Sequence, residues 1–138
     1  MRCRSTTQLN IQAMDSIKLC RMLKDRKILS ETIITEILNR ALFLLQTEDT
    51  RYNRLQFDAR GLATIVYQLA KLDYGISTEF LHAWTNKAIN LIEDFIPQGL
   101  ANSIWAFGHL GIKPSAQFIR PFSKLVKVVQ NYKCQRSN

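Results

Sequence analysis

Apolar residues in the middle of the chain recur at intervals of three and four, which is the spacing of one face of an α-helix. The clearest run comprises Leu62, Ile65, Val66, Leu69 and Leu72. Asp58 stands just before it and is a favourable N-cap residue, while residues 73–75 include the glycine typical of a helix end. The pattern predicts a helix that begins after Asp58 and stops around residues 73–75.

A second apolar stripe follows at once. Ser77 can cap its first turn, and Glu79 lies near the positive end of the helix dipole. The apolar positions that continue the helical spacing are Phe80, Leu81, Trp84, Ala88, Leu91 and Ile92. Residues 57–94 therefore predict a helical hairpin.

The same pattern returns 38 residues later, where Gly61 matches Gly99 and Leu72 matches Leu110. Pro97 suits a first helical turn, and Gly111 followed by Pro114 suits a helix end. A copy of the second helix is expected to begin at Ser115, with a kink or a late start because Pro121 falls inside it. A fixed period of this length is typical of helical arrays.

A third, divergent copy lies upstream. Ser30 and Glu31 precede an apolar run that matches the Ser77 helix, and a first helix is expected from about Ile11 to Lys24. The polar residues 46–56 show no periodicity and predict a loop. The predicted fold is all-α: one domain, 1–138, forming a short α-solenoid of three helical hairpins at about 11–45, 57–94 and 95–131. Residues 1–10 and 132–138 are predicted tails.

Charge adds a preference for polyanionic partners. The 138 residues include 19 Lys and Arg against 11 Asp and Glu, a formal charge of +8. Every acidic residue lies at or before Asp94, so the last third is purely cationic. Basic surfaces attract phosphates, although a solubilising surface explains the charge equally well.

Other features bear on compartment and catalysis. Three scattered cysteines, Cys3, Cys20 and Cys134, favour a reducing compartment, with Cys20 an inert buried thiol. No apolar run approaches a membrane span, so a cytoplasmic protein without membrane contact is expected; organelle targeting and host-directed secretion remain alternatives. His82 and His109 have no partners at zinc-ligand spacing, and the neighbouring carboxylates Glu93 and Asp94 point apart on a helix. The sequence therefore predicts no enzyme, metal or cofactor.

Residues 57–72, and especially 95–111 (FIPQGLANSIWAFGHLG), resemble the octotricopeptide and heptatricopeptide repeats. They are similar as well to a bacterial repeat family of unknown function found in obligate intracellular bacteria. The resemblance extends over about residues 57–131, and less closely over 11–45. It implies an α-solenoid, and its octotricopeptide branch implies binding of single-stranded RNA at about one base per repeat.

The positions of the first helices that the apolar stripe leaves exposed are candidates for an RNA-binding surface. Lysine and arginine there can hold phosphates, while Thr64, Gln68 and Asn102 can contact base edges. Lys24, Lys71 and His109 occupy equivalent places, and Ala106 is expected to be exposed beside them. The full set of candidates is Arg21, Lys24, Thr64, Gln68, Lys71, Asn102, His109, Lys113, Lys124 and Lys127. The alternative is an ordinary solvated helix face.

Two tryptophans offer a further test of these interpretations. Trp84 and Trp105 can act as stacking platforms for unpaired bases, but their helical positions favour packing in the core. Asn102 and Ser103 are expected to form hydrogen bonds between repeats.

Two alternative hypotheses remain beside RNA binding. One is a protein-interaction scaffold or secreted bacterial factor, with an acidic protein as partner of the cationic last third. The other is a fragment of a longer array, which would self-associate through exposed apolar residues of its C-terminal repeat: Leu125, Val126 or Val129.

Overall fold

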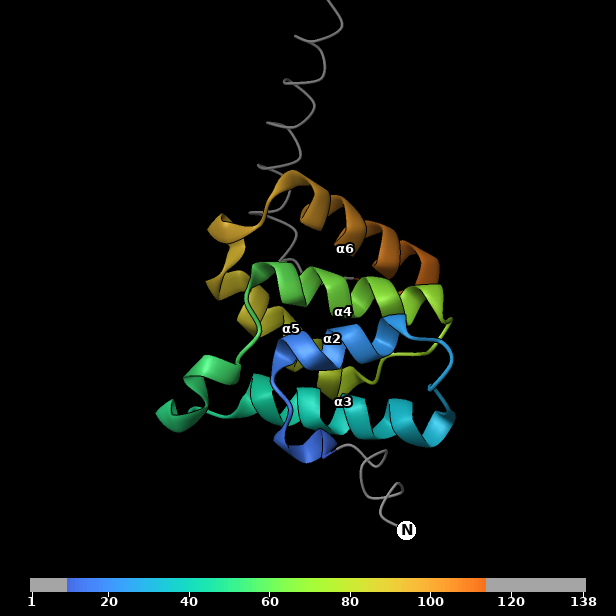
Figure 1. Cartoon of the computed structure of the whole chain (residues 1–138). Helices are drawn as coiled ribbons and strands as arrows, with labels where there is room; N and C mark the ends of the chain where they lie inside the picture. Colours follow the sequence, from blue (N-terminus) through green and yellow to red (C-terminus); the bar gives the residue numbers. More distant parts are fainter. Residues whose placement is uncertain (1–9, 114–138) are drawn as a thin grey trace, which may run out of the picture. The chain divides into compact units, whose positions relative to one another are not determined.

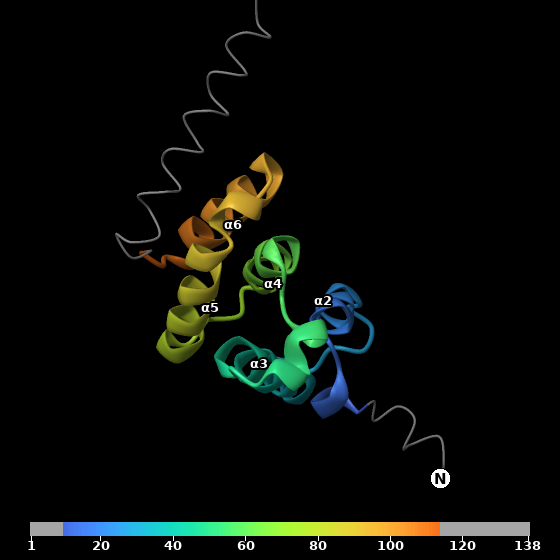
Figure 2. The same ribbon diagram turned by 90° about the vertical axis from the view of Figure 1, so that its left-hand side faces the viewer.

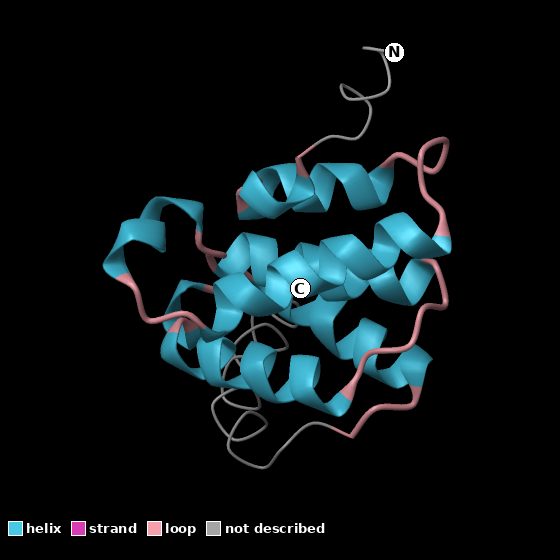
Figure 3. Ribbon diagram, turned by 90° about the horizontal axis from the view of Figure 1, so that it is seen from below, coloured by secondary structure: helices cyan, strands magenta, loops and turns pink. Residues whose placement is uncertain are grey.

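The computed structural model describes residues 10–113, and every regular element in that range is helical (Figures 1 and 3). The predicted all-α class is therefore confirmed. The elements are η1 (Ile11–Ala13), α2 (Ser16–Lys24), α3 (Glu31–Gln46), η2 (Thr50–Leu55), α4 (Ala59–Lys71), α5 (Thr78–Asn90), η3 (Ile92–Asp94) and α6 (Pro97–Leu110). No described helix is both long and apolar enough to cross a membrane.

The chain divides into two compact units, Met1–Phe57 and Asp58–Asn138. We call them the N-terminal and the C-terminal unit. Their boundary coincides with the start of the second predicted repeat, whereas a single domain for the whole chain stays a prediction. The predicted second helix of the third repeat, from Ser115 through Pro121, lies outside the described residues.

In the N-terminal unit, α2 and α3 pack together around the fully buried side chains Leu19, Leu23, Ile37 and Leu44. The prediction of one continuous helix from residue 11 to residue 24 is wrong. The chain instead makes the short 3-10 turn η1, and α2 begins at Ser16. The cause is Asp15, which adopts an extended backbone and whose carboxylate accepts a hydrogen bond from the Lys18 N–H at 2.9 Å, as an N-cap does.

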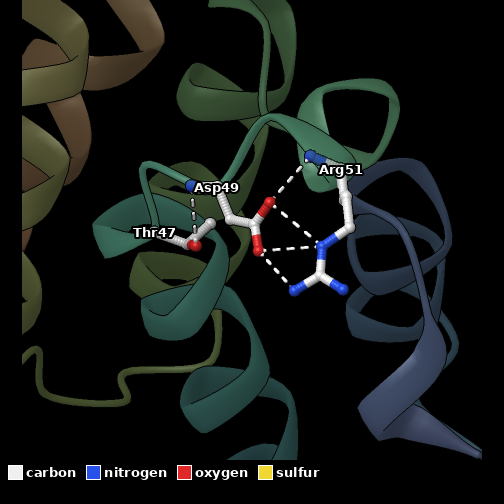
Figure 4. Close-up of polar contacts among 3 residues, drawn as sticks. All are labelled: Thr47, Asp49 and Arg51. Atoms are coloured by element: carbon white, nitrogen blue, oxygen red, sulfur yellow. Dashed lines mark hydrogen bonds and ion pairs between the residues drawn. The ribbon is translucent and has the colours of Figure 1, made fainter.

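The polar stretch after α3 is not an irregular loop as predicted, because residues 50–55 form the 3-10 helix η2 (Figure 4). The Asp49 carboxylate accepts hydrogen bonds from the Arg51 main-chain N–H at 3.0 Å and from its guanidinium at 2.7 Å. The Asp49 N–H in turn donates to Thr47 Oγ1. No residue of η2 is buried, so this helix has no apolar face that a hydrophobic pattern could show.

The helix starts of the C-terminal unit follow the predictions, but α5 ends at Asn90, before the predicted stripe residues Leu91 and Ile92, and neither of these two is buried. The Asp58 carboxylate accepts a hydrogen bond from the Gly61 N–H at 2.8 Å, and Ser77 Oγ accepts one from the Phe80 N–H at 3.1 Å. α6 starts with Pro97 and ends at Gly111, whose φ of 70° is the left-handed conformation that glycine adopts without strain. The capping and terminating residues predicted from the sequence thus mark where α4, α5 and α6 begin, and where α6 ends.

α4 and α6 are neighbours that run in the same direction (Figures 1 and 2). α5, which lies between them in the sequence, carries the chain back to the start of α6. A methyl group at Gly99 of α6 would lie only 3.4 Å from the Ala63 Cβ of α4, so the two helices approach closely at their first turns. The core of this unit includes Leu62, Ile65, Leu69, Trp84 and Phe107. The 38-residue repeat of the sequence therefore corresponds to two parallel helices packed side by side.

Candidate nucleic-acid interface

Aromatic side chains meet near the C-terminal ends of α4 and α6. The Tyr67 and Trp105 ring centroids lie 5.3 Å apart at an angle of 55°. These residues occupy matching places in the repeat, so the parallel arrangement of the two helices brings them together. Trp105 is 45% exposed, which leaves a large part of the indole open to solvent.

Each aromatic ring has a nitrogen-bearing side chain one turn further along its own helix. Lys71 Nζ lies 5.4 Å from the centre of the Tyr67 ring, a cation–π distance. His109 stacks on Trp105 with centroids 4.9 Å apart and planes only 15° from parallel. Both pairs have the i, i+4 spacing that makes neighbours on a helix surface.

Asp73 joins this group from the end of α4. Its carboxylate Oδ1 lies 2.6 Å from His109 Nε2, and both side chains are exposed. Asp73 has a φ of 54°, the left-handed region, and the next N–H, that of Tyr74, bonds back to the Leu69 carbonyl oxygen. This is the Schellman ending of a helix, which Gly111 repeats at the end of α6.

The contact with Asp73 fixes one proton on the imidazole. An ionised carboxylate can only accept hydrogen bonds, so His109 Nε2 must carry a hydrogen, either in the neutral ring or in the imidazolium. Asp73 thereby orients the histidine that stacks on Trp105. We call Tyr67, Lys71, Asp73, Trp105 and His109 the aromatic cluster.

The structure brings some of the sequence-predicted residues together. Lys71 and His109 are exposed and belong to the aromatic cluster, which agrees with their predicted equivalence. Thr64, Gln68 and Asn102 are half-buried on the same two helices. Arg21 and Lys24 are exposed in the last turn of α2 in the N-terminal unit, and Lys113 is exposed beyond α6. Lys124 and Lys127 lie outside the described residues.

Three predictions about this surface are wrong. Ala106 is fully buried, because it lies two turns from Gly99 on the side of α6 that packs against α4. Trp105 is not a core residue, whereas Trp84 is fully buried as expected. The Ser103 hydroxyl does not bridge repeats; it donates to the Gly99 carbonyl oxygen of its own helix at 2.9 Å.

Tyr67 and Asp73 are absent from the sequence-predicted site, and Trp105 enters the sequence analysis only as a stacking platform that is less favoured than core packing. A signal for two of them exists: an aromatic residue followed four positions later by Lys or His appears in both copies of the repeat, at Tyr67–Lys71 and Trp105–His109. A helical stripe alone cannot show whether such an aromatic ring sits at the middle or at the edge of the buried face.

The cluster offers an aromatic surface, a cation and a carboxylate, and it lacks the ligand set of a metal centre. Within residues 10–113, no three His, Cys, Asp or Glu side chains gather closely enough to hold a metal ion. Compared with known proteins, the chain matches no family model, no curated protein and no solved structure.

Proposed function

We propose that the protein is a non-catalytic module that binds single-stranded RNA, with unpaired bases stacking at the aromatic cluster. The observation that carries the proposal is the half-exposed Trp105, which contacts Tyr67 and stacks with a nearly parallel His109 ring. Exposed aromatic faces beside cations are the usual platform for unpaired bases, and stacking contributes about 1–3 kcal/mol per base. RNA binding also agrees with the resemblance to octotricopeptide repeats and with the net charge of +8.

The proposal includes an α-solenoid of three hairpins, in which the first helices line one surface. The parallel packing of α4 against α6 supports this arrangement, because each repeat then places its aromatic residue and its cation one helix further along. Arg21 and Lys24 occupy the last turn of α2, the first helix of the predicted first repeat.

The charges within the aromatic cluster indicate which interaction should contribute most to RNA affinity. Lys71 and Asp73 carry opposite formal charges, so the cluster attracts phosphates only weakly. Stacking on Trp105 should therefore contribute more here than phosphate neutralisation, which falls mainly to the basic residues elsewhere in the chain. With one such cluster in the described residues, binding to a short RNA should be moderate.

Fluorescence anisotropy with a labelled RNA pool of mixed sequence tests the proposal. We expect micromolar binding that weakens with salt, together with quenching of the exposed tryptophan, since stacked bases quench indole emission. Poly-glutamate serves as the matched polyanion without bases, and it should compete poorly. Absence of RNA binding at low salt, or equal competition by poly-glutamate without quenching, would reject base recognition by this cluster.

A further inference from the structure

α6 packs against one face of α4, and α6 has a face of its own made of the same kinds of residues. On α4 this face consists of Ala63, Val66 and Ala70, whose exposed fractions are 3%, 0% and 0%. α6 shields it by the close approach at Gly99, so it forms an established helix–helix interface within the chain.

The 38-residue offset carries these positions to a set of the same kind on α6: Ala101, Ile104 and Gly108. All three are exposed, and Ile104 is 46% exposed where its counterpart Val66 is fully covered. We call this set the open α6 face. It continues the α4–α6 interface to one more helix, for which the described residues supply no occupant.

The shape of the open α6 face suits a second helix. Ile104 projects between two small residues, three positions before it and four after it, which lie beside it on the helix surface. A Cβ added at Gly108 would meet nothing within 4 Å, so there is room for an incoming side chain. A ridge flanked by hollows is complementary to a copy of itself turned around.

The distribution of charge also favours α6 as the helix through which two identical copies meet. Two chains of net charge +8 repel each other, and a contact between them has to avoid adding to this repulsion. α6 contains no Asp, Glu, Lys or Arg, whereas α2, α3, α4 and α5 each carry at least two. Among the described α-helices, α6 is thus the one that can face its own copy without pairing like charges.

We propose that the open α6 face pairs with the same face of a second copy of this chain about a twofold axis. Ile104 of each protomer then lies between the small residues Ala101 and Gly108 of the other. One helix face per protomer is a small interface compared with the 1,200–2,000 Å² total of stable complexes. The dimer is therefore weak, reversible and dependent on protein concentration.

Analytical ultracentrifugation of the nuclease-treated full chain over a wide concentration range tests this. The mass should rise from 16.0 kDa toward twice that value. Gly108→Leu fills the hollow, and because there is open space at this position the protomer should fold normally; Ile104→Glu places charge at the centre of the face. Both variants should remain at 16.0 kDa, while Ile17→Glu, which alters an equally large exposed residue on α2, should dimerise like the wild type.

Two results overturn the proposal. One is a wild-type mass that stays at 16.0 kDa at the highest concentration. The other is a dimer that persists in both α6 variants, which would assign association to another surface, such as the predicted apolar residues 125–129. Loss of RNA binding in a separate assay leaves this outcome unaffected, so the two proposals fail independently.

Discussion

The indole N–H of Trp84 donates a hydrogen bond to the main-chain carbonyl oxygen of Leu62, 22 residues earlier in the chain and 2.9 Å away. The same indole ring meets Phe107 edge to face, with centroids 5.1 Å apart and planes at 88°. One fully buried side chain of α5 therefore connects α4 and α6. These contacts explain why Trp84 belongs to the core.

The two tryptophans should respond differently to the same substitution. Trp84→Phe removes a buried hydrogen bond and leaves a cavity, and we expect it to lower the free energy of unfolding by about 1–3 kcal/mol. Trp105→Phe changes a half-exposed ring and should stay within about 0.5 kcal/mol of the wild type. Urea unfolding followed by far-UV circular dichroism measures both. Equal losses would contradict the assignment of Trp84 to the core.

The register of α6 can be tested with one charge at two positions three residues apart. Phe107→Asp buries an unpaired carboxylate beside Trp84, at a cost of several kcal/mol, which is comparable to the total stability of a small domain. Ile104→Asp places the same group at an exposed position. Circular dichroism should show loss of helix in the first variant, as for Leu69→Asp, and retained helix in the second. Retained helicity in Phe107→Asp would mean that this face is wrongly assigned.

The sequence predicts the starts of α4, α5 and α6 and the end of α6 closely, because these positions carry strong local signals. Asp58 and Ser77 are good caps, and Gly111 is a good terminator, whatever the helices pack against. The predictions fail where the outcome depends on neighbours. Ala106 and Trp105 lie on one helix within the predicted pattern, and only the position of α4 decides that the first is buried and the second exposed.

The aromatic cluster shows the same limit. Lys71 and His109 follow from their matching places in the repeat, but the contact between His109 and Asp73 depends on the geometry of a helix end. Sequence spacing indicates that α4 stops near residue 73, yet it cannot show that the terminating residue directs its carboxylate toward the next first helix.

Asp73 has two roles: its left-handed backbone ends α4, as Gly111 ends α6, and its carboxylate contacts His109. Substitutions can separate these two roles. Asp73→Gly should keep the left-handed turn and leave stability within about 0.5 kcal/mol, because glycine adopts a positive φ freely. Asp73→Val should cost about 1–3 kcal/mol, since β-branched residues are strained there. Thermal unfolding compares the two variants. A valine variant as stable as the glycine variant would show that the turn does not require this conformation.

The start of η2 gives a defined pH dependence. Hydrogen bonds from the Arg51 side chain, and then from its main chain, hold the pKa of Asp49 below its ordinary value of 3.8. A carboxyl group whose pKa is lowered by folding stabilises the folded state above its unfolded pKa, and this contribution is lost as pH falls through the lowered value. The effect should be small because the pair is exposed. NMR titration of the Asp49 carboxyl carbon should give a midpoint below 3.8. Arg51→Ala should raise this midpoint toward the ordinary value without fully restoring it, because the main-chain hydrogen bond from residue 51 remains.

The final prediction separates stacking from charge at the aromatic cluster. Trp105→Ala should weaken binding of a mixed-sequence RNA about 5- to 150-fold, the equivalent of about 1–3 kcal/mol for one stacked base. Its salt dependence should match that of the wild type, because no charge is lost. Lys71→Ala should weaken binding less and reduce the slope of log K against log salt by up to about one, if the lysine contacts a phosphate.

Ile96→Ala is the matched control for these variants. It truncates another large exposed side chain of the C-terminal unit, at the opposite end of α6 from the cluster, and it should leave RNA affinity unchanged. Because Trp105 is half-exposed, its alanine variant should fold, which circular dichroism can verify before the binding assay. If Trp105→Ala and Ile96→Ala bind RNA as tightly as the wild type, bases do not stack at this cluster, and any affinity comes from basic residues elsewhere in the chain.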